Sequence, residues 1–215
     1  MKLNIKKFGF WIDPGASQGS ANDIVNKHEE IKSEIAGLNS GFINQVNTLW
    51  YTKTANDTTV GFSNDVNEKI VTPLQGNFET LLNNYVSTAN NLLSESGETI
   101  SGSISGAQNT NVDWSYAAGS KNLLPDLGEL GGFVSSTAVP RLEAIRDKAN
   151  ELVSLLQGAG DMDSASKSAM INDARIVSNN ANNLSQTVQN TFTKAAEAEE
   201  TSVQNIQKTN QQRNG

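Results

Sequence analysis

The sequence predicts an all-α protein in which two long antiparallel helical hairpins form an elongated four-helix bundle or stalk. Two observations support this fold class. Apolar residues recur at steps of three and four along several long segments, which is the spacing of a helical seam. Only 36% of the 215 residues are hydrophobic and 6% are aromatic, against ~45–50% apolar residues in an average globular domain. A narrow bundle needs fewer apolar residues because each helix buries only one stripe.

An extended N-terminal arm is expected to precede the first hairpin. In residues 1–19, apolar side chains alternate with Lys and Asn before the run DPGASQGS breaks any regular structure. The first hairpin is expected over residues 20–100, and its first helix should begin near Ser20, a favourable N-cap residue. The seam of this helix follows steps of four, three, four, three and four through Ile24, His28, Ile31, Ile35, Leu38 and Phe42.

A turn is expected between the two arms of the first hairpin, over Leu49–Phe62. β-Branched residues, Asn and Asp cluster there and disfavour a helix. The second arm should begin near Ser63, and Pro73 should bend it because proline removes one backbone donor. The apolar stripe of this arm includes Phe62, Val66, Ile70, Leu74, Phe78, Leu81 and Tyr85.

The second hairpin is expected over residues 126–215, after a Gly/Ser-rich linker at residues 101–125. Its first helix should cover roughly Asp126–Gln157. Pro140 suits the first turn of a helix, so the regular part of this helix should start there. The run QGAGDMD then predicts a tight turn.

The last helix should be capped by Asp163 or Ser164. Its stripe is Val177, Ala181, Leu184, Val188, Phe192 and Ala195. Beyond this stripe the run QKTNQQRNG is polar, so the final ~10 residues are expected to fray.

The overall composition narrows the classes of partner. With 16 Lys and Arg against 23 Asp and Glu, the net charge is −7. Neither nucleic acid nor an anionic lipid surface is expected as a partner, because both attract a basic face. The chain has no cysteine, which excludes disulfides and zinc–thiolate sites. We recognise neither a signal peptide nor the ~18–20 apolar residues of a membrane span. No stable membrane insertion is therefore expected, and export would need a signal-peptide-independent route.

Residues that could carry chemistry are sparse. His28 is the only histidine, and the sequence lacks the partners that a metal or acid–base site needs, so we expect a buried seam residue. Asp161–Ser164 is similar to the start of a calcium loop but lacks the closing Glu. The runs GELGG and SGSISG lack the Lys of a phosphate-binding loop. We expect no catalytic, cofactor-binding or metal-binding residue and no enzymatic activity.

The tryptophans allow two interpretations. Trp50 lies with Tyr51 at the tip of the first hairpin. Its indole either plugs the end of the hairpin or is offered to a partner, since Trp is common among the residues that dominate interfaces. The plug is the favoured interpretation. Trp11 and Trp114 have the same ambiguity.

The first hairpin carries a run that resembles a known family. The run LWYTKTANDTTVGFSNDVNEKIVTPLQGNFETLLNNYVSTANNLL is similar to the second half of the hairpin in LXG domains, which belong to the WXG/LXG superfamily of type VII secretion substrates. Leu49–Trp50 occupies the turn, Phe62 the start of the following helix, and Pro73–Leu74 an apolar-Pro-Leu step. The resemblance covers residues 20–95.

The chain also departs from the family pattern in two places. Tyr51 follows Trp50 where the motif has a glycine. No Tyr-x-x-x-Asp/Glu export signal is present, because Tyr85 is followed four positions later by Ala89. In this superfamily a helical partner can supply that signal, so the resemblance implies export as a complex.

The resemblance implies a non-enzymatic helical protein that is exported by, or targets cargo to, a bacterial type VII secretion system. Such a protein would be secreted or displayed at the cell surface, as an effector or virulence factor. Its first hairpin would pair with small helical WXG-like proteins, and the secretion ATPase would recognise the complex. The residues expected to bind the partner are Ile31, Ile35, Leu38, Phe42, Leu49, Trp50, Phe62, Phe78, Leu81 and Tyr85.

Two alternatives to this function stay open. The chain could be a helical adaptor or chaperone for a larger secreted toxin. It could also be a membrane-active, pore-forming toxin, for which Leu127–Val139 is the candidate segment.

Overall fold

The described part of the chain is helical apart from its connections and one extended segment. The computed structural model describes residues 14–94, 97, 99–100, 104–114 and 124–214, and no strand occurs among them. The all-α fold class is therefore confirmed. The elements are α1 (Pro14–Leu38), η1 (Asn39–Ile43), α2 (Val46–Leu49), α3 (Lys53–Val66), η2 (Asn67–Val71), η3 (Leu74–Phe78), α4 (Glu79–Leu93), α5 (Leu127–Gly158) and α6 (Ser164–Asn214).

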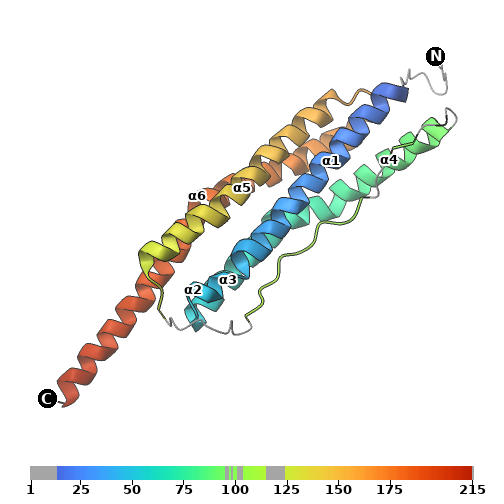
Figure 1. The fold of residues 1–215 in the computed structure, drawn as a ribbon. Helices are drawn as coiled ribbons and strands as arrows, with labels where there is room; N and C mark the ends of the chain where they lie inside the picture. The colour runs from blue at the N-terminus through green and yellow to red at the C-terminus, as the bar shows by residue number, and fades with distance from the viewer. Residues whose placement is uncertain (1–13, 95–96, 98, 101–103, 115–123, 215) are drawn as a thin grey trace.

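These elements form an elongated bundle with four arms. α1 continues through η1 and α2 as the first arm, α3 to α4 return as the second, and α5 and α6 form the second hairpin. α1 packs against α4 and α5, and α6 packs against α5 and the second arm. Figure 1 shows the arms side by side along one long axis, with the red end of α6 extending past the others. The two hairpins share one apolar interior.

α1 confirms the heptad seam but begins earlier than predicted. Its seam residues from Ile24 to Phe42 are each at most 3% exposed. The helix starts at Pro14 rather than near Ser20, so residues 14–19 of the predicted extended arm are helical. Proline suits the first turn because its φ angle is already helical and its missing N–H would be unpaired there. The rest of the predicted arm lies outside the described residues.

The turn between the arms of the first hairpin is shorter than predicted. It covers residues 50–52, so the prediction of a turn as far as Phe62 is wrong. The Thr52 hydroxyl caps α3 by accepting a backbone hydrogen bond at 3.1 Å. The hydroxyls of Thr58 and Thr59 donate to carbonyls four residues earlier. α3 is held as a helix by the packing of its buried face, which includes Phe62 and Val66, against α6.

The second arm bends near Pro73, but the break lies beside the proline. Pro73 has helical angles (φ −60°, ψ −31°), whereas Gly76 does not (φ −78°, ψ −112°). Wide helical turns, η2 and η3, flank the proline. Because proline has no N–H, the carbonyl of Lys69 loses its helical donor. Asn180 of α6 replaces it, with Nδ2 donating to that carbonyl oxygen at 2.8 Å.

The second hairpin has the predicted cap at the start of α6 but differs from the prediction at two other places. Asp126 caps α5 and Asp163 caps α6, each accepting a backbone hydrogen bond at 2.9 Å. α5 runs through Pro140, so the prediction that its regular part starts there is wrong. Pro140 is exposed, where water can pair with the carbonyl it leaves without a donor. α6 stays helical to Asn214, where the sequence predicts fraying.

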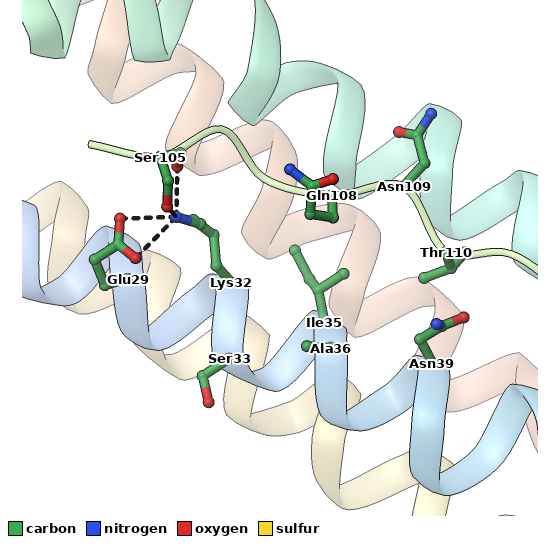
Figure 2. A pocket seen from close by; sticks show the side chains of 10 residues that line it. All are labelled: Glu29, Lys32, Ser33, Ile35, Ala36, Asn39, Ser105, Gln108, Asn109 and Thr110. Atoms are coloured by element: carbon green, nitrogen blue, oxygen red, sulfur yellow. Dashed lines mark hydrogen bonds and ion pairs between the residues drawn. The ribbon is translucent and has the colours of Figure 1, made fainter. Parts of the chain in front are cut away.

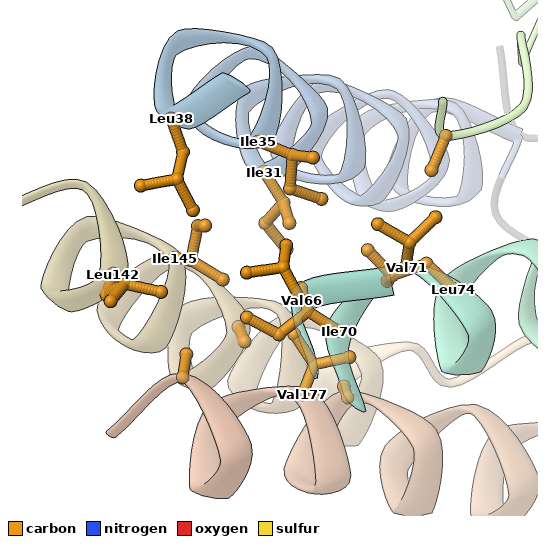
Figure 3. Packing of buried hydrophobic residues seen from close by; sticks show 14 of the residues in the cluster. Ile31, Ile35, Leu38, Val66, Ile70, Val71, Leu74, Leu142, Ile145 and Val177 are labelled. Carbon is orange, nitrogen blue, oxygen red and sulfur yellow. The ribbon is translucent and has the colours of Figure 1, made fainter. Parts of the chain in front are cut away.

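Aromatic and aliphatic side chains from both hairpins fill the interior. The ring centroid of Phe42 lies 5.5 Å from that of Phe62 and 5.1 Å from that of Phe192. Phe133 of α5 lies 5.6 Å from the same ring. Figure 3 shows an aliphatic region in which side chains of all four arms point toward one another, including Ile31, Ile35, Leu38, Val66, Ile70, Val71, Leu74, Leu142, Ile145 and Val177.

We expect Phe42→Ala to destabilise the bundle by about 3–5 kcal/mol, since it removes buried apolar surface and leaves a cavity. Urea unfolding followed by circular dichroism measures the loss. Ile176→Ala is the matched control, because that side chain of α6 is 38% exposed. The control should change the free energy of unfolding by less than about 1 kcal/mol. Equal effects of the two substitutions would contradict this packing.

Candidate functional site

Most of the residues predicted to bind a partner lie inside the bundle. Those that are at most 9% exposed are Ile31, Ile35, Leu38, Phe42, Trp50, Phe62, Phe78 and Tyr85. Leu49 and Leu81 are half-buried. α5 and α6 cover the seam that the sequence predicts as a docking face. In this conformation these residues stabilise the chain's own fold, and their binding to a partner stays a prediction.

Trp50 closes one end of the bundle. Its side chain is 0% exposed, and the indole Nε1 donates a hydrogen bond to Oε2 of Glu199 at 2.7 Å. The hydroxyl of Thr52 donates to the same oxygen at 2.9 Å. Glu199 therefore ties the tip of the first hairpin to α6. The interpretation of Trp50 as a plug is confirmed, whereas Trp11 lies outside the described residues.

An extended segment lies along the first hairpin where the sequence predicts a linker. Residues 104–114, here called the strap, have no regular secondary structure, and Figure 1 shows them running alongside the first hairpin toward α2. Ala107 and Thr110 are buried. Trp114 stacks on Tyr51, with ring centroids 5.6 Å apart. This part of the predicted linker is therefore packed against the bundle.

Side chains of the second arm hold the strap by its backbone. Asn67 clamps Thr110: Nδ2 donates to its carbonyl at 2.8 Å, and Oδ1 accepts from its N–H at 2.7 Å. The amide of Gln75 donates to the carbonyl of Ala107. Oε1 of Glu79 accepts from the N–H of Ala107 at 2.7 Å. These contacts satisfy backbone groups that a helix or sheet would otherwise pair.

Side chains of the first arm hold the strap from the other side. Asn39 exchanges two hydrogen bonds with Asn111, at 3.2 and 3.0 Å. Oδ1 of Asn44 accepts from the N–H of Asp113 at 2.7 Å. Both arms of the first hairpin thus form hydrogen bonds with the backbone of the strap, mostly through amide side chains.

A pocket of about 390 Å³ remains between α1 and the strap. Figure 2 shows Lys32 at one side of it, with Nζ reaching Ser105 of the strap and the carboxylate of Glu29. Lys32 and Glu29, 2.8 Å apart, are the charged side chains of the pocket lining. Because they neutralise each other, the pocket presents no unpaired charge to a ligand.

His28 is buried beside the strap. Its ring is 0% exposed and stacks on Phe78, with centroids 5.6 Å apart. Nε2 lies 3.2 Å from Oε1 of Glu79, the carboxylate that also accepts from the strap. Burial lowers the pKa of His28 below its ordinary value, although the negative charge of Glu79 opposes the shift. The imidazole is a core residue, as the sequence predicts, and it is neutral in the folded bundle near neutral pH.

The end of α6 extends beyond the rest of the bundle. From residue 201 to residue 213 every side chain is exposed except Val203, which is half-buried. Ile206 is 61% exposed, more than any other large apolar side chain in the described ranges. We call residues 201–214 the tail. Its apolar face is the most open one that the described part of the chain presents.

Sequence reasoning misses the strap and the tail for different reasons. The strap has no periodicity, and the amides that hold it are scattered along both arms of the first hairpin. No local pattern could reveal it. The tail is rich in Asn and Gln, which suggests fraying. A signal was nevertheless present, because the steps from Glu199 to Val203 and Ile206 continue the helical seam.

Comparisons with known proteins assign no function to the strap, the pocket or the tail, so these features are interpreted from geometry alone. No protein-family model matches the chain, and neither a curated protein nor a solved structure is significantly similar to it. Among the described residues, no three His, Asp or Glu side chains gather as metal ligands do. In the same ranges, no helix combines the length and the apolar character that a membrane crossing requires.

We expect the stability of the bundle to fall as the pH drops from about 7 to about 5. The pKa of folded His28 is lowered, so the unfolded chain, with an ordinary histidine pKa of about 6.5, takes up a proton that the folded chain does not. The stability from this group is complete above about pH 6.5 and declines below it. Thermal melts measure the drop, which His28→Gln should reduce. An equal drop in both proteins would rule out this origin.

We expect Glu199→Ala to lower the free energy of unfolding by about 1–3 kcal/mol, because Trp50 and Thr52 lose their acceptor and the indole N–H is left buried. A urea titration measures the change. Glu197→Ala is the matched control, since that side chain is exposed on the same helix and should matter by less than about 0.5 kcal/mol. Similar losses would show that Glu199 is an ordinary surface residue.

Proposed function

We propose that the chain is a non-enzymatic helical protein that acts by helix–helix pairing in a bacterial type VII secretion system. It is exported itself or carries cargo to the export machinery, and it leaves the cell by a signal-peptide-independent route. Its partners are small helical proteins of the WXG kind, and the secretion ATPase recognises the complex. The resemblance of Leu49–Leu93 to the LXG hairpin supports this proposal.

The geometry of the first hairpin is the observation that carries the proposal. The family pattern is a helical hairpin whose arms meet at a Leu/Trp turn. Here two helical arms meet at residues 50–52, with Trp50 buried at the tip. The Pro-Leu step of the run lies in the bent part of the second arm. A hairpin with one apolar seam is stable when a second hairpin packs against it.

In this chain the second hairpin already occupies that place. α5 packs on α1, and α6 packs on the second arm, so the bundle has the architecture of two paired hairpins fused in one chain. A partner therefore meets a closed bundle. Within the described residues, the tail offers the most exposed large apolar side chain, Ile206, with the half-buried Val203 on the same face. Burying apolar surface there contributes ~25 cal/mol per Å².

Mass spectrometry of culture supernatants, from the native bacterium with and without its type VII ATPase, tests the proposal. We expect the chain in the supernatant only when the ATPase is present. Ile206→Asp should reduce both export and co-purification of the small helical partner, because a charge is costly to bury in an apolar contact. Ile176→Asp is the matched control, since Ile176 is a 38% exposed position on α6 within the bundle.

The other outcomes separate the alternatives. A chain retained in the cytosol of both strains contradicts the proposal. Co-purification of a larger toxin, instead of small helical proteins, identifies an adaptor. Leakage of liposomes identifies a pore-forming protein, whose candidate segment Leu127–Val139 lies in α5 with Leu130 and Val134 at 0% exposure.

A further inference from the structure

The buried ring of His28 lies between two carboxylates. Its Nε2 is 3.2 Å from Oε1 of Glu79 on α4, and its Nδ1 is 3.6 Å from Oε1 of Glu29 on α1. The ring is 0% exposed, and among the described residues neither nitrogen has an aligned hydrogen-bond partner. Buried polar atoms in native proteins are rarely left in that state. The neutral ring therefore gains little from the place where the bundle holds it.

The same two carboxylates hold the beginning of the strap. Oε1 of Glu79, the oxygen nearest the ring, accepts a hydrogen bond from the N–H of Ala107 at 2.7 Å. Glu29 forms an ion pair of 2.8 Å with Lys32, and Nζ of Lys32 donates to the hydroxyl of Ser105 at 2.6 Å (Figure 2). The ring and the start of the strap are thus coupled through shared charged groups.

From Thr110 onward, the strap is held by amide side chains, which do not titrate. Asn67 pairs with both the N–H and the carbonyl of Thr110. In the earlier part of the strap, the carbonyl of Ala107 also has an amide donor, Gln75, whereas its N–H depends on a carboxylate. Within one extended segment, the N–H of Ala107 is therefore held by a titratable group and the N–H of Thr110 is not.

The closed bundle is a poor place for a protonated ring. Burial is the main influence on the ring, and it lowers the pKa of His28. The charged side chains that act on the ring are Glu79, Lys32 and Glu29, of which Lys32 adds to the lowering of the pKa and the carboxylates oppose it. Lys148 and Glu151, which α5 sets against this stretch of α1, pair with other side chains of α1. The strap carries no charged side chain from residue 104 to residue 112.

We propose that protonation of His28 opens the start of the strap, residues 104–107, here called the latch. When the latch leaves, water reaches the carboxylate of Glu79 and the ring beside it, and a hydrated imidazolium no longer carries the cost of burial. The proton therefore favours the open form. Amide side chains keep the rest of the strap in place, and the pocket of about 390 Å³ between α1 and the strap opens to solvent. This device needs neither a partner nor an export route.

The linkage sets the direction and the size of the effect. A hydrated imidazole takes up a proton below about pH 6.5, whereas the closed site resists it because burial lowers the pKa of the ring. If the closed form takes up no proton, the equilibrium constant for opening grows by up to about tenfold between about pH 7.5 and about pH 5.5. Above about pH 6.5 the ring is neutral in both forms, and pH no longer shifts the latch.

Amide hydrogen exchange of the full chain, followed by NMR between about pH 7.5 and about pH 5.5, tests the latch. Each rate is divided by its intrinsic rate, and the value for Ala107 is then divided by that for Thr110 in the same sample. This ratio cancels the direct effect of pH on exchange. We expect the ratio to rise by up to about tenfold on acidification. His28→Gln should keep the ratio constant, because the group that takes up the proton is gone.

Glu79→Gln separates the ring from the carboxylate. The glutamine oxygen can still accept from Ala107 but cannot titrate, so the rise should persist in this variant. A rise that is lost in Glu79→Gln and kept in His28→Gln assigns the effect to the carboxylate and overturns the proposal. A constant ratio in the unchanged chain also overturns it.

The ring signal gives a readout that needs no variant, because His28 is the chain's only histidine. We expect its NMR titration to give a pKa below the ordinary value of about 6.5. A ring that titrates at or above that value overturns the proposal, since the closed site would then hold the proton at least as well as water does. The exchange ratio and this titration decide the question even if His28→Gln does not fold.

Discussion

The apolar seam of α1 must be covered, and the way the chain covers it decides the rest of the structure. Ile31, Ile35 and Leu38 lie among side chains of the second arm and of the second hairpin (Figure 3). Exposing such a stripe to water would cost about 25 cal/mol for each Å² of apolar surface. Because α5 and α6 belong to the same chain, the cover needs no partner protein. A docking function must then use surfaces that the closed bundle leaves outside.

Amide side chains explain how the bundle tolerates irregular backbone. Where Pro73 leaves a carbonyl without a donor, Asn180 of α6 supplies one. Where the strap has no regular structure, Asn67 and Asn39 pair with its backbone from the two arms. Buried backbone groups must be paired by some donor or acceptor. The abundance of Asn and Gln, which suggests only solvated helix faces in the sequence, thus has a structural role on the first hairpin.

The fold class, the seam of α1 and the cap of α6 could be predicted because each depends on residues close in sequence. The short turn at residues 50–52 could not, because α3 is held as a helix by packing against α6, a contact distant in sequence that overrides its poor propensity. The predicted partner-binding residues lie on the apolar stripes of the first hairpin, because the sequence shows such a stripe but does not show which helices cover it. The tie between Trp50 and Glu199 spans the bundle, and no local pattern encodes it.

Native-state hydrogen exchange of the dilute chain tests most directly whether the α1 seam is covered within the chain. If α5 and α6 cover it, amides around Ile31, Ile35 and Leu38 should exchange only through opening of the whole bundle, as slowly as the centre of α5. Amides of residues 201–214 should exchange fast, because nothing covers the tail of a monomer. Fast exchange along α1, with α5 and α6 protected, would show a first hairpin that waits open for a partner and would contradict the account.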